Sequence, residues 1–337
     1  MRAPSLTITP MSQERVALEP VDGVEVQTLI DNSSDMLLPG GELVKRPGWE
    51  IGPRVESAVT LDPTLPRYLS AEHGFSALVT VTAGGNTRRL MFDAGLSTDG
   101  LARNLDVLQL PLADVEALVF SHGHIDHVGG LHGLIDRFGA RQLPLMLHPD
   151  FWLQRRIVAP KVEPFEIPPP SKQAVERAGF EVIEGASPSL LLDGCVLITG
   201  EVARTTGFEK GFAAHQAQRG GEWTPDPLIL DDQALVVNVR DRGLVVLTGC
   251  GHAGLINIVR HAQGLTGEQR VYAVIGGFHL SGRAFEPVIA PTVDALREIA
   301  PSLIVPGHCT GFAAVSAMAD ALPDAVVLNS VGTRYVL

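Results

Sequence analysis

Residues 121–130 most constrain what this chain can fold into, because three histidines and an aspartate fall within six positions there. They directly follow the apolar run 115–120, which predicts a buried strand. Open α/β sheets place ligand sites at the carboxyl ends of their strands. Neutral imidazole and carboxylate groups are common ligands of zinc and related divalent metals. The segment therefore predicts a metal site at the mouth of a sheet.

The spacing within this segment allows two neighbouring metal ions. Alternate positions of an extended loop can point His122 and His124 at one ion, while Asp126 and His127 face a second ion nearby. Two glycines follow and let the backbone turn tightly into the next helix. One histidine alone would more often be structural, but four ligand-type side chains at this spacing favour metal binding.

Other expected strands also end in glycine-containing loops that carry a histidine or an aspartate. These strands are expected at 88–92, 244–247, 271–275 and 303–306. Asp93, in the first of these loops, is expected either to orient a ligand histidine or to act as a cap or turn residue. Asn32, after a strand expected at 24–30, either reaches the site or completes a turn. The recurrence indicates that several loops converge on one site.

The order of elements predicts the fold class. Hairpins at 76–92 and 234–247 each begin a half that continues through strand–helix units. Helices are expected at 98–108, 128–138, 171–178, 255–264 and 289–299, and further strands at 143–148, 180–184 and 189–198. Two similar halves of this kind predict an αββα sandwich, with two stacked mixed sheets and helices on the outer faces.

Residues 23–337 are expected to form a single domain, preceded by a loosely attached leader at 1–22. Long loops are expected at 35–70, 151–175 and 201–232. Long loops near a metal site suggest contacts with substrate or a lid over it.

Composition limits the partners. The formal charge of −12 argues against nucleic acid, whose phosphates require clustered Lys and Arg, but leaves small substrates open, including anionic ones. No apolar run reaches the roughly 18 residues that a membrane helix needs. Three scattered cysteines and no signal-peptide pattern favour a reducing compartment, so a cytoplasmic location is expected.

The pattern at 122–127 resembles the HxHxDH signature of the metallo-β-lactamase superfamily. The resemblance extends over roughly residues 24–330. Further motifs resemble one subgroup, named for 7,8-dihydropterin-6-methyl-4-(β-D-ribofuranosyl)-aminobenzene-5′-phosphate synthase, at 72–76, 92–95, 248–252, 276–280 and 306–311. The superfamily implies an αββα fold and one or two metal ions, usually zinc and sometimes iron or manganese.

The resemblance assigns ligands by position. It implies that His122 and His124 hold the first metal, that Asp126 and His127 hold the second, and that His308 completes the second site.

The later ligands depart from the superfamily pattern. Cys250 stands where an aspartate is normal, and it is expected to be either a bridging or second-metal ligand or a small buried residue. His252 is expected to be a ligand. The usual middle histidine has no counterpart near 200–209, so either Glu201 replaces it or the first metal is held more weakly.

Among the remaining histidines, His279 follows two glycines at a strand end. It is expected either to bind substrate or transfer a proton, or to be a hydrogen-bonded structural residue. Structural roles are expected for His73, His148, His215 and His261.

Three functions remain open. The first is a metal-dependent hydrolase that activates water toward a small ester, phosphoester or amide, with Asp126 orienting the nucleophile and a neighbouring His or Tyr protonating the leaving group. The second, implied by the subgroup, is a transferase that joins a dihydropterin methyl group to an aminobenzene ribotide. The third is a non-catalytic metal-binding sensor, which the intact ligand pattern disfavours.

Overall fold

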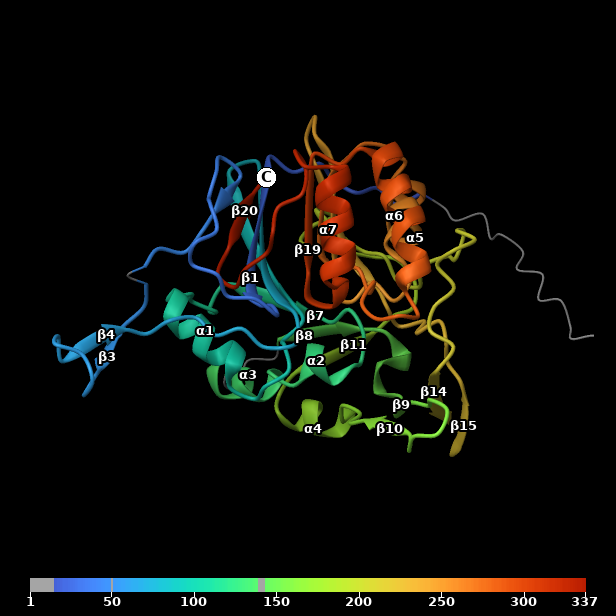
Figure 1. Cartoon of the computed structure of the whole chain (residues 1–337), viewed down its shortest axis with the longest axis horizontal. Helices are drawn as coiled ribbons and strands as arrows, with labels where there is room; N and C mark the ends of the chain where they lie inside the picture. Colours follow the sequence, from blue (N-terminus) through green and yellow to red (C-terminus); the bar gives the residue numbers. More distant parts are fainter. Residues whose placement is uncertain (1–14, 50, 139–142) are drawn as a thin grey trace, which may run out of the picture.

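The computed structural model describes residues 15–49, 51–138 and 143–337, and its two large sheets stack face to face between layers of helices (Figure 1). The predicted αββα sandwich is therefore confirmed.

The first sheet has eight strands in the order β11-β8-β7-β6-β5-β1-β20-β2. Its strands are β1 (Gly23–Ile30), β2 (Val44–Lys45), β5 (Ser76–Ala83), β6 (Asn86–Phe92), β7 (Val115–Val119), β8 (Pro144–Leu147), β11 (Glu181–Glu184) and β20 (Arg334–Val336). β5 and β6 form the predicted hairpin, and β6, β7, β8 and β11 then run parallel. The carboxyl ends of these parallel strands therefore meet at one edge.

The second sheet has six strands in the order β12-β13-β16-β17-β18-β19. They are β12 (Ser189–Leu191), β13 (Val196–Ile198), β16 (Ala234–Val239), β17 (Gly243–Thr248), β18 (Val271–Gly277) and β19 (Leu303–Gly307). β16 and β17 form the second predicted hairpin, and β17, β18 and β19 run parallel. The two halves thus repeat one plan, as the sequence predicted.

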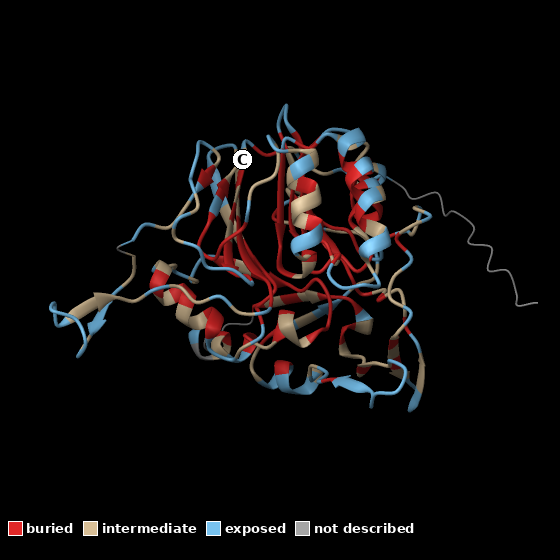
Figure 2. Ribbon diagram, in the orientation of Figure 1, coloured by how far each residue is buried: buried red, intermediate tan, exposed pale blue. Residues whose placement is uncertain are grey.

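Helices cover the outer face of each sheet. They are α1 (Gly100–Leu108), α2 (Ile125–Val128), α3 (Leu131–Phe138), α4 (Lys172–Arg177), α5 (Leu255–Thr266), α6 (Glu286–Ile299) and α7 (Phe312–Ala321). One apolar core lies between the sheets, a second packs the six-stranded sheet against α5, α6 and α7, and a third packs the eight-stranded sheet against α1 and α3. Strands such as β17 are buried on both faces, which explains their unbroken Val and Leu runs (Figure 2).

Some local predictions were wrong. The strand expected at 189–198 is instead the hairpin of β12 and β13, because Leu192 and Asp193 turn the chain at φ values of 51° and 55°. Helix α7 and strand β20 were not predicted from the sequence.

Part of the expected leader is packed against the domain. Residues 1–14 lie outside the described residues, but Val21 is fully buried and its N–H bonds the carbonyl of Asn238 at 2.9 Å. Val16 similarly donates to the carbonyl of Leu265 at 2.8 Å. These backbone bonds hold the segment from Val16 onward against α5 and the second sheet.

The segments expected as long loops contain short strands. Within 35–70, β3 (Arg54–Glu56) and β4 (Thr64–Pro66) form a small hairpin. From 151–175 come β9 (Arg155–Ile157) and β10 (Phe165–Ile167), and from 201–232 come β14 (His215–Arg219) and β15 (Glu222–Pro225). These last four strands pair in the order β10-β9-β14-β15 and make a separate sheet.

A buried arginine ties this small sheet to the body of the domain. Arg155 on β9 is 1% exposed, and its Nη2 lies 2.6 Å from Asp231 Oδ1 while its Nε lies 3.1 Å from Asp226 Oδ2. Removing the cation would leave buried Asp231 without a cationic partner and Asp226 with only the partly exposed Arg219, which costs far more than losing an exposed pair.

We therefore expect Arg155→Ala to lower the free energy of unfolding by about 3–5 kcal/mol in urea denaturation. The matched control is Arg54→Ala, whose exposed pair with Asp62 should contribute no more than about 1 kcal/mol. Equal losses in the two variants would contradict a role for the buried pair.

Candidate metal centre

The expected ligands come from three loops at the carboxyl ends of parallel strands. The loop after β7 and helix α2 carry the cluster at 122–127, the loop after β17 carries Cys250 and His252, and the turn after β19 carries His308. Glycine permits this close approach at Gly249, where a Cβ would overlap the Ser121 side chain. The stacking of the two sheets thus brings residues from both halves of the chain together.

One group of ligand atoms contains Asp126, His127, Cys250 and His308, and all four atoms lie within 4.8 Å of one another. Cys250 Sγ lies 3.2 Å from His127 Nε2 and 3.3 Å from His308 Nε2. Asp126 Oδ2 lies 3.3 Å from His308 Nε2. The structure therefore brings together the whole set expected for the second metal, with the cysteine included.

A second group contains His122, His252 and the same Cys250, again within 4.8 Å. The Nε2 atoms of His122 and His252 are 3.2 Å apart. The ring of His124 lies 4.6 Å from that of His122 and 4.9 Å from that of His252, and its buried Nε2 has no hydrogen-bond partner. Such an orphaned, inward-facing nitrogen fits a metal ligand.

His252 accordingly supplies an imidazole to the first group, for which no middle histidine was found near 200–209. Glu201 does not join the ligand groups found among the described residues, because its carboxylate lies 3.2 Å from His148 Nε2 and is 47% exposed. Cys250 Sγ is common to both groups, so it lies where one thiolate could contact two ions.

Burial sets the protonation of the first group. It lowers the pKa of His122, His124 and His252 well below the usual value, so these imidazoles are neutral and keep a lone pair for a metal. Burial also raises the pKa of the Cys250 thiol well above its usual value. A metal bound there would have to displace the thiol proton.

In the second group, neighbouring charges outweigh burial in setting the pKa values. Burial opposes charge on Asp126, but His127, His308 and His73 outweigh it and hold the pKa of this carboxyl far below its usual value. Burial likewise opposes charge on His308, yet Cys309 and Asp126 raise the pKa of this imidazole to about 10. A metal would replace this proton as the partner of the carboxylate.

Four buried aspartates accept backbone N–H bonds from the ligand loops. Asp93, after β6, accepts the N–H of Ser121 at 2.7 Å, and its other oxygen lies 2.7 Å from His127 Nδ1. This contact leaves Nε2 of His127 facing the cluster, so the alternative in which Asp93 orients a ligand histidine agrees with the geometry. Asp231 accepts the N–H of Gly123 at 2.9 Å.

The other two aspartates hold the later loops. Asp232 accepts the N–H of Ala253 at 2.8 Å, next to His252. Asp31 accepts the N–H of His308 at 2.6 Å, and Asn32 Oδ1 lies 3.2 Å from His308 Nδ1. Each loop that carries a ligand is therefore fixed by at least one carboxylate that is at most 2% exposed.

His279 lies at the edge of the centre. Its ring packs 4.1 Å from that of His252, and its buried Nδ1 has no hydrogen-bond partner. It also forms a third group with Cys250 and Cys309, within 4.8 Å. Its side chain also hydrogen-bonds Cys309, so both expected roles of His279, with substrate or as a hydrogen-bonded structural residue, stay predictions.

Two histidines for which the sequence predicted only structural roles line the cavity over the ligand groups. His73 Nε2 lies 3.4 Å from Asp126 Oδ2, and the side chain is 61% exposed. His215, on β14, is buried with its ring 5.3 Å from that of His124. His73 lies in a motif of the resemblance, but nothing near His215 in the sequence marks it as a cavity residue.

The cavity over the centre has a volume of about 650 Å³. Its floor is formed by ligand residues, and part of its wall comes from Ile157, Phe165, Ile167 and His215 of the small sheet. This size suits a small organic molecule.

The model of the metallo-beta-lactamase superfamily matches residues 71–255, which is more than half of the chain. The protein therefore belongs to this superfamily.

Two curated relatives come from the archaeon Methanocaldococcus jannaschii. The first, 7,8-dihydropterin-6-methyl-4-(beta-D-ribofuranosyl)-aminobenzene-5′-phosphate synthase, is 28% identical over 72% of this chain and 83% of its own length. The second is uncharacterized and is 29% identical over 78% of this chain and 93% of its own length.

A solved structure described as a metal-dependent hydrolase of the beta-lactamase superfamily has a similar fold, with a TM-score of 0.68 and 23% identity over 92% of this chain and 98% of that one.

Among the described residues, no helix has both the length and the apolar character to cross a membrane.

We expect Asp93→Ala to weaken zinc binding by about 10–100-fold, because His127 loses the carboxylate that orients it. Competition with a chromophoric chelator measures this change. Asp114→Ala, which removes an exposed carboxylate paired with Arg89, is the matched control and should leave affinity unchanged. Equal affinity of the Asp93 variant and the parent would contradict the assigned role.

Zinc binding is also expected to release protons, because the Cys250 thiol and the His308 imidazole hold protons at neutral pH that ligation displaces. Acid favours the protonated ligands, so zinc affinity should rise between about pH 6 and 8. Calorimetry in two buffers of different ionisation enthalpy counts the released protons, and Cys250→Ala should reduce the count. A pH-independent affinity would contradict this expectation.

Proposed function

We propose that this protein is a divalent-metal-dependent hydrolase that acts on a small ester, phosphoester or amide-type substrate, with zinc as its metal. The observation that carries the proposal is the pair of ligand groups sharing Cys250 at the floor of a 650 Å³ cavity. Bound at such residues, divalent metal supplies Lewis acidity and makes water acidic enough to react near neutral pH.

The residues around the ligands can assist such a reaction. The histidines His127, His308 and His73 hold the pKa of the Asp126 carboxyl far below its usual value, and its Oδ2 faces both His308 and His73. We assign to it the orientation of the nucleophile as well as metal binding. His73 is the most exposed of the three histidines that face Asp126, so we assign to it the delivery of a proton to the leaving group.

The second candidate is a transferase, which the synthase among the curated relatives supports. In this function the same residues would bind an anionic leaving group, and a second substrate rather than water would supply the nucleophile. The notable difference is the fate of water, which enters the product only in hydrolysis. The superfamily itself favours hydrolysis only weakly, because one fold supports several chemistries.

Metal content tests the centre itself. We expect about two metal ions per chain by elemental analysis, and fewer in both His127→Ala and Cys250→Ala, because Cys250 belongs to both groups. His132→Ala, an exposed histidine on α3, is the matched control. A content of one metal ion per chain that is unchanged in Cys250→Ala would contradict a cysteine shared by two ions. Failure of the parent to bind zinc, iron or manganese would overturn the proposed enzyme.

Reactions in ¹⁸O-labelled water test the chemistry. A panel of phosphoesters, esters and lactones, followed by mass spectrometry, should give product that contains one labelled oxygen. Asp126→Asn should lower kcat/KM by about 100-fold or more, whereas Asp114→Asn should not. Turnover without label would favour the transferase, and parent-level activity of Asp126→Asn would contradict the role of this residue.

A further inference from the structure

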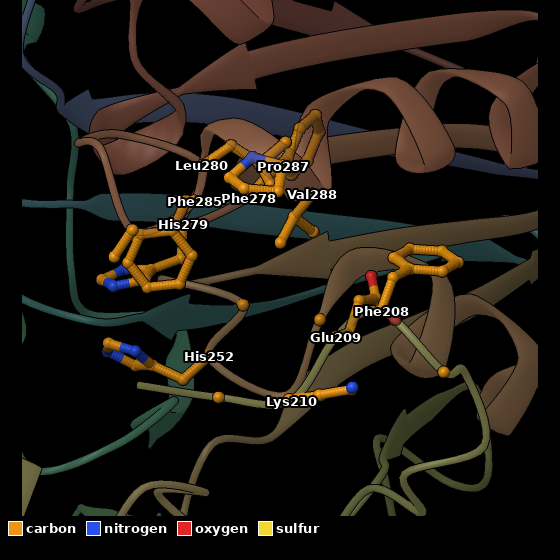
Figure 3. A pocket seen from close by; sticks show the side chains of 15 residues that line it. Phe208, Glu209, Lys210, His252, Phe278, His279, Leu280, Phe285, Pro287 and Val288 are labelled. Carbon is orange, nitrogen blue, oxygen red and sulfur yellow. The ribbon is translucent and has the colours of Figure 1, made fainter. Parts of the chain in front are cut away.

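A second cavity, of about 440 Å³, adjoins the cavity over the ligand groups. The two cavities share His252 and His279 in their walls. In Figure 3 these two histidines stand on one side, Phe208 stands on the opposite side, and Val288 and Lys210 lie between them. A molecule with its reacting bond beside His252 could therefore extend an arm into this second space.

The walls of the second cavity suit a flat apolar group. Aromatic residues make up only 5% of the chain, yet three of its twelve phenylalanines line this space. The apolar lining consists of Phe208, Phe278, Leu280, Phe285, Pro287 and Val288. The ring of Phe285 meets His279 edge to face at 4.7 Å, which continues the aromatic wall from one cavity to the other.

The charged residues of this cavity are not equivalent. Glu209 is buried, but its carboxylate accepts the N–H groups of Ile256 and Asn257 at the start of α5, each at 2.8 Å, and the hydroxyl of Thr206 at 2.9 Å. These donors occupy both of its oxygens, and burial raises the pKa of this carboxyl above its usual value. Lys210 is exposed and forms no ion pair with any of the residues that the structure describes.

Lys210 is therefore the uncompensated charge of a cavity with aromatic walls, in a protein whose net charge is −12. An ammonium group in such a place attracts an anion and can donate a charge-assisted hydrogen bond to it. The lining selects for a planar ring, and the lysine selects for a negative substituent on it.

We propose that this second cavity is a substrate subsite for an aromatic group that carries an anionic substituent. The inference rests on the proposed function, because it takes the ligand groups as the place of reaction. The scissile or acceptor bond lies beside His252 and His279, the ring lies between Phe208 and Phe285, and the anion lies at Lys210.

Binding of 2-naphthalenesulfonate to the full-length, metal-loaded protein tests this proposal, since an aryl sulfonate is a poor metal ligand. Its uncharged match is 2-naphthalenemethanol. We expect Lys210→Met to weaken the sulfonate by about tenfold, the loss of one charge-assisted hydrogen bond, and to leave the alcohol within about twofold. Titration calorimetry or ligand-observed NMR gives both affinities.

Val288→Trp, on a partly exposed position of α6, should fill the cavity and weaken both probes by about tenfold or more. Lys172→Met removes an exposed lysine on α4 that pairs with Glu184, and it should change neither affinity. Circular dichroism and metal content confirm that each variant is folded. If Val288→Trp does not fold, the comparison of Lys210→Met with Lys172→Met still decides the role of the charge.

The outcomes separate this proposal from the proposed function. The subsite is overturned if Lys210→Met binds the sulfonate with the affinity of the parent, or if the parent shows no detectable binding. Either result holds whether or not the enzyme turns over a substrate. Lys210-dependent binding without any hydrolytic or transfer activity supports the subsite and counts against the proposed reaction.

Discussion

Hydrogen bonds from backbone N–H groups to buried carboxylates hold the metal-ligand loops, and the rest of the site depends on them. An isolated buried carboxylate is costly, and several N–H donors offset that cost only if the loop keeps one conformation. Asp93, Asp231, Asp232 and Asp31 act in this way on the loops that carry the two ligand groups. The ligands are thus fixed by neighbours that themselves come from the ends or beginnings of strands.

The sequence predicted the parts of this arrangement that are local. The cluster at 122–127 and the hairpins at 76–92 and 234–247 have short-range patterns, so both were found. The roles of Asp31 and Asp231 depend on partners 277 and 108 positions away, and nothing near them in the sequence reveals those partners. His252 was predicted as a ligand, but its place beside His122 and His124 depends on the stacking of the two sheets, which the sequence does not reveal.

The small sheet was missed for a related reason. Its strands are short and lack a clean alternation, and β9 pairs with β14 across more than fifty intervening residues. The same sheet contributes Ile157 and His215 to the wall of the cavity, while the second cavity is lined by 207–211 and by the start of α6. Segments that interrupt the repeated plan of the fold therefore surround the ligand groups, which is where members of a common fold diverge in function.

The bond from His308 to Asp31 also has a consequence for how the protein is made. It joins the end of the first strand of the eight-stranded sheet to a turn 277 residues later. During synthesis from the N-terminus, the cluster at 122–127 leaves the ribosome long before this turn exists. The complete ligand set can assemble only after this turn has emerged, so a metal held by all of these ligands could not guide the folding of the first half.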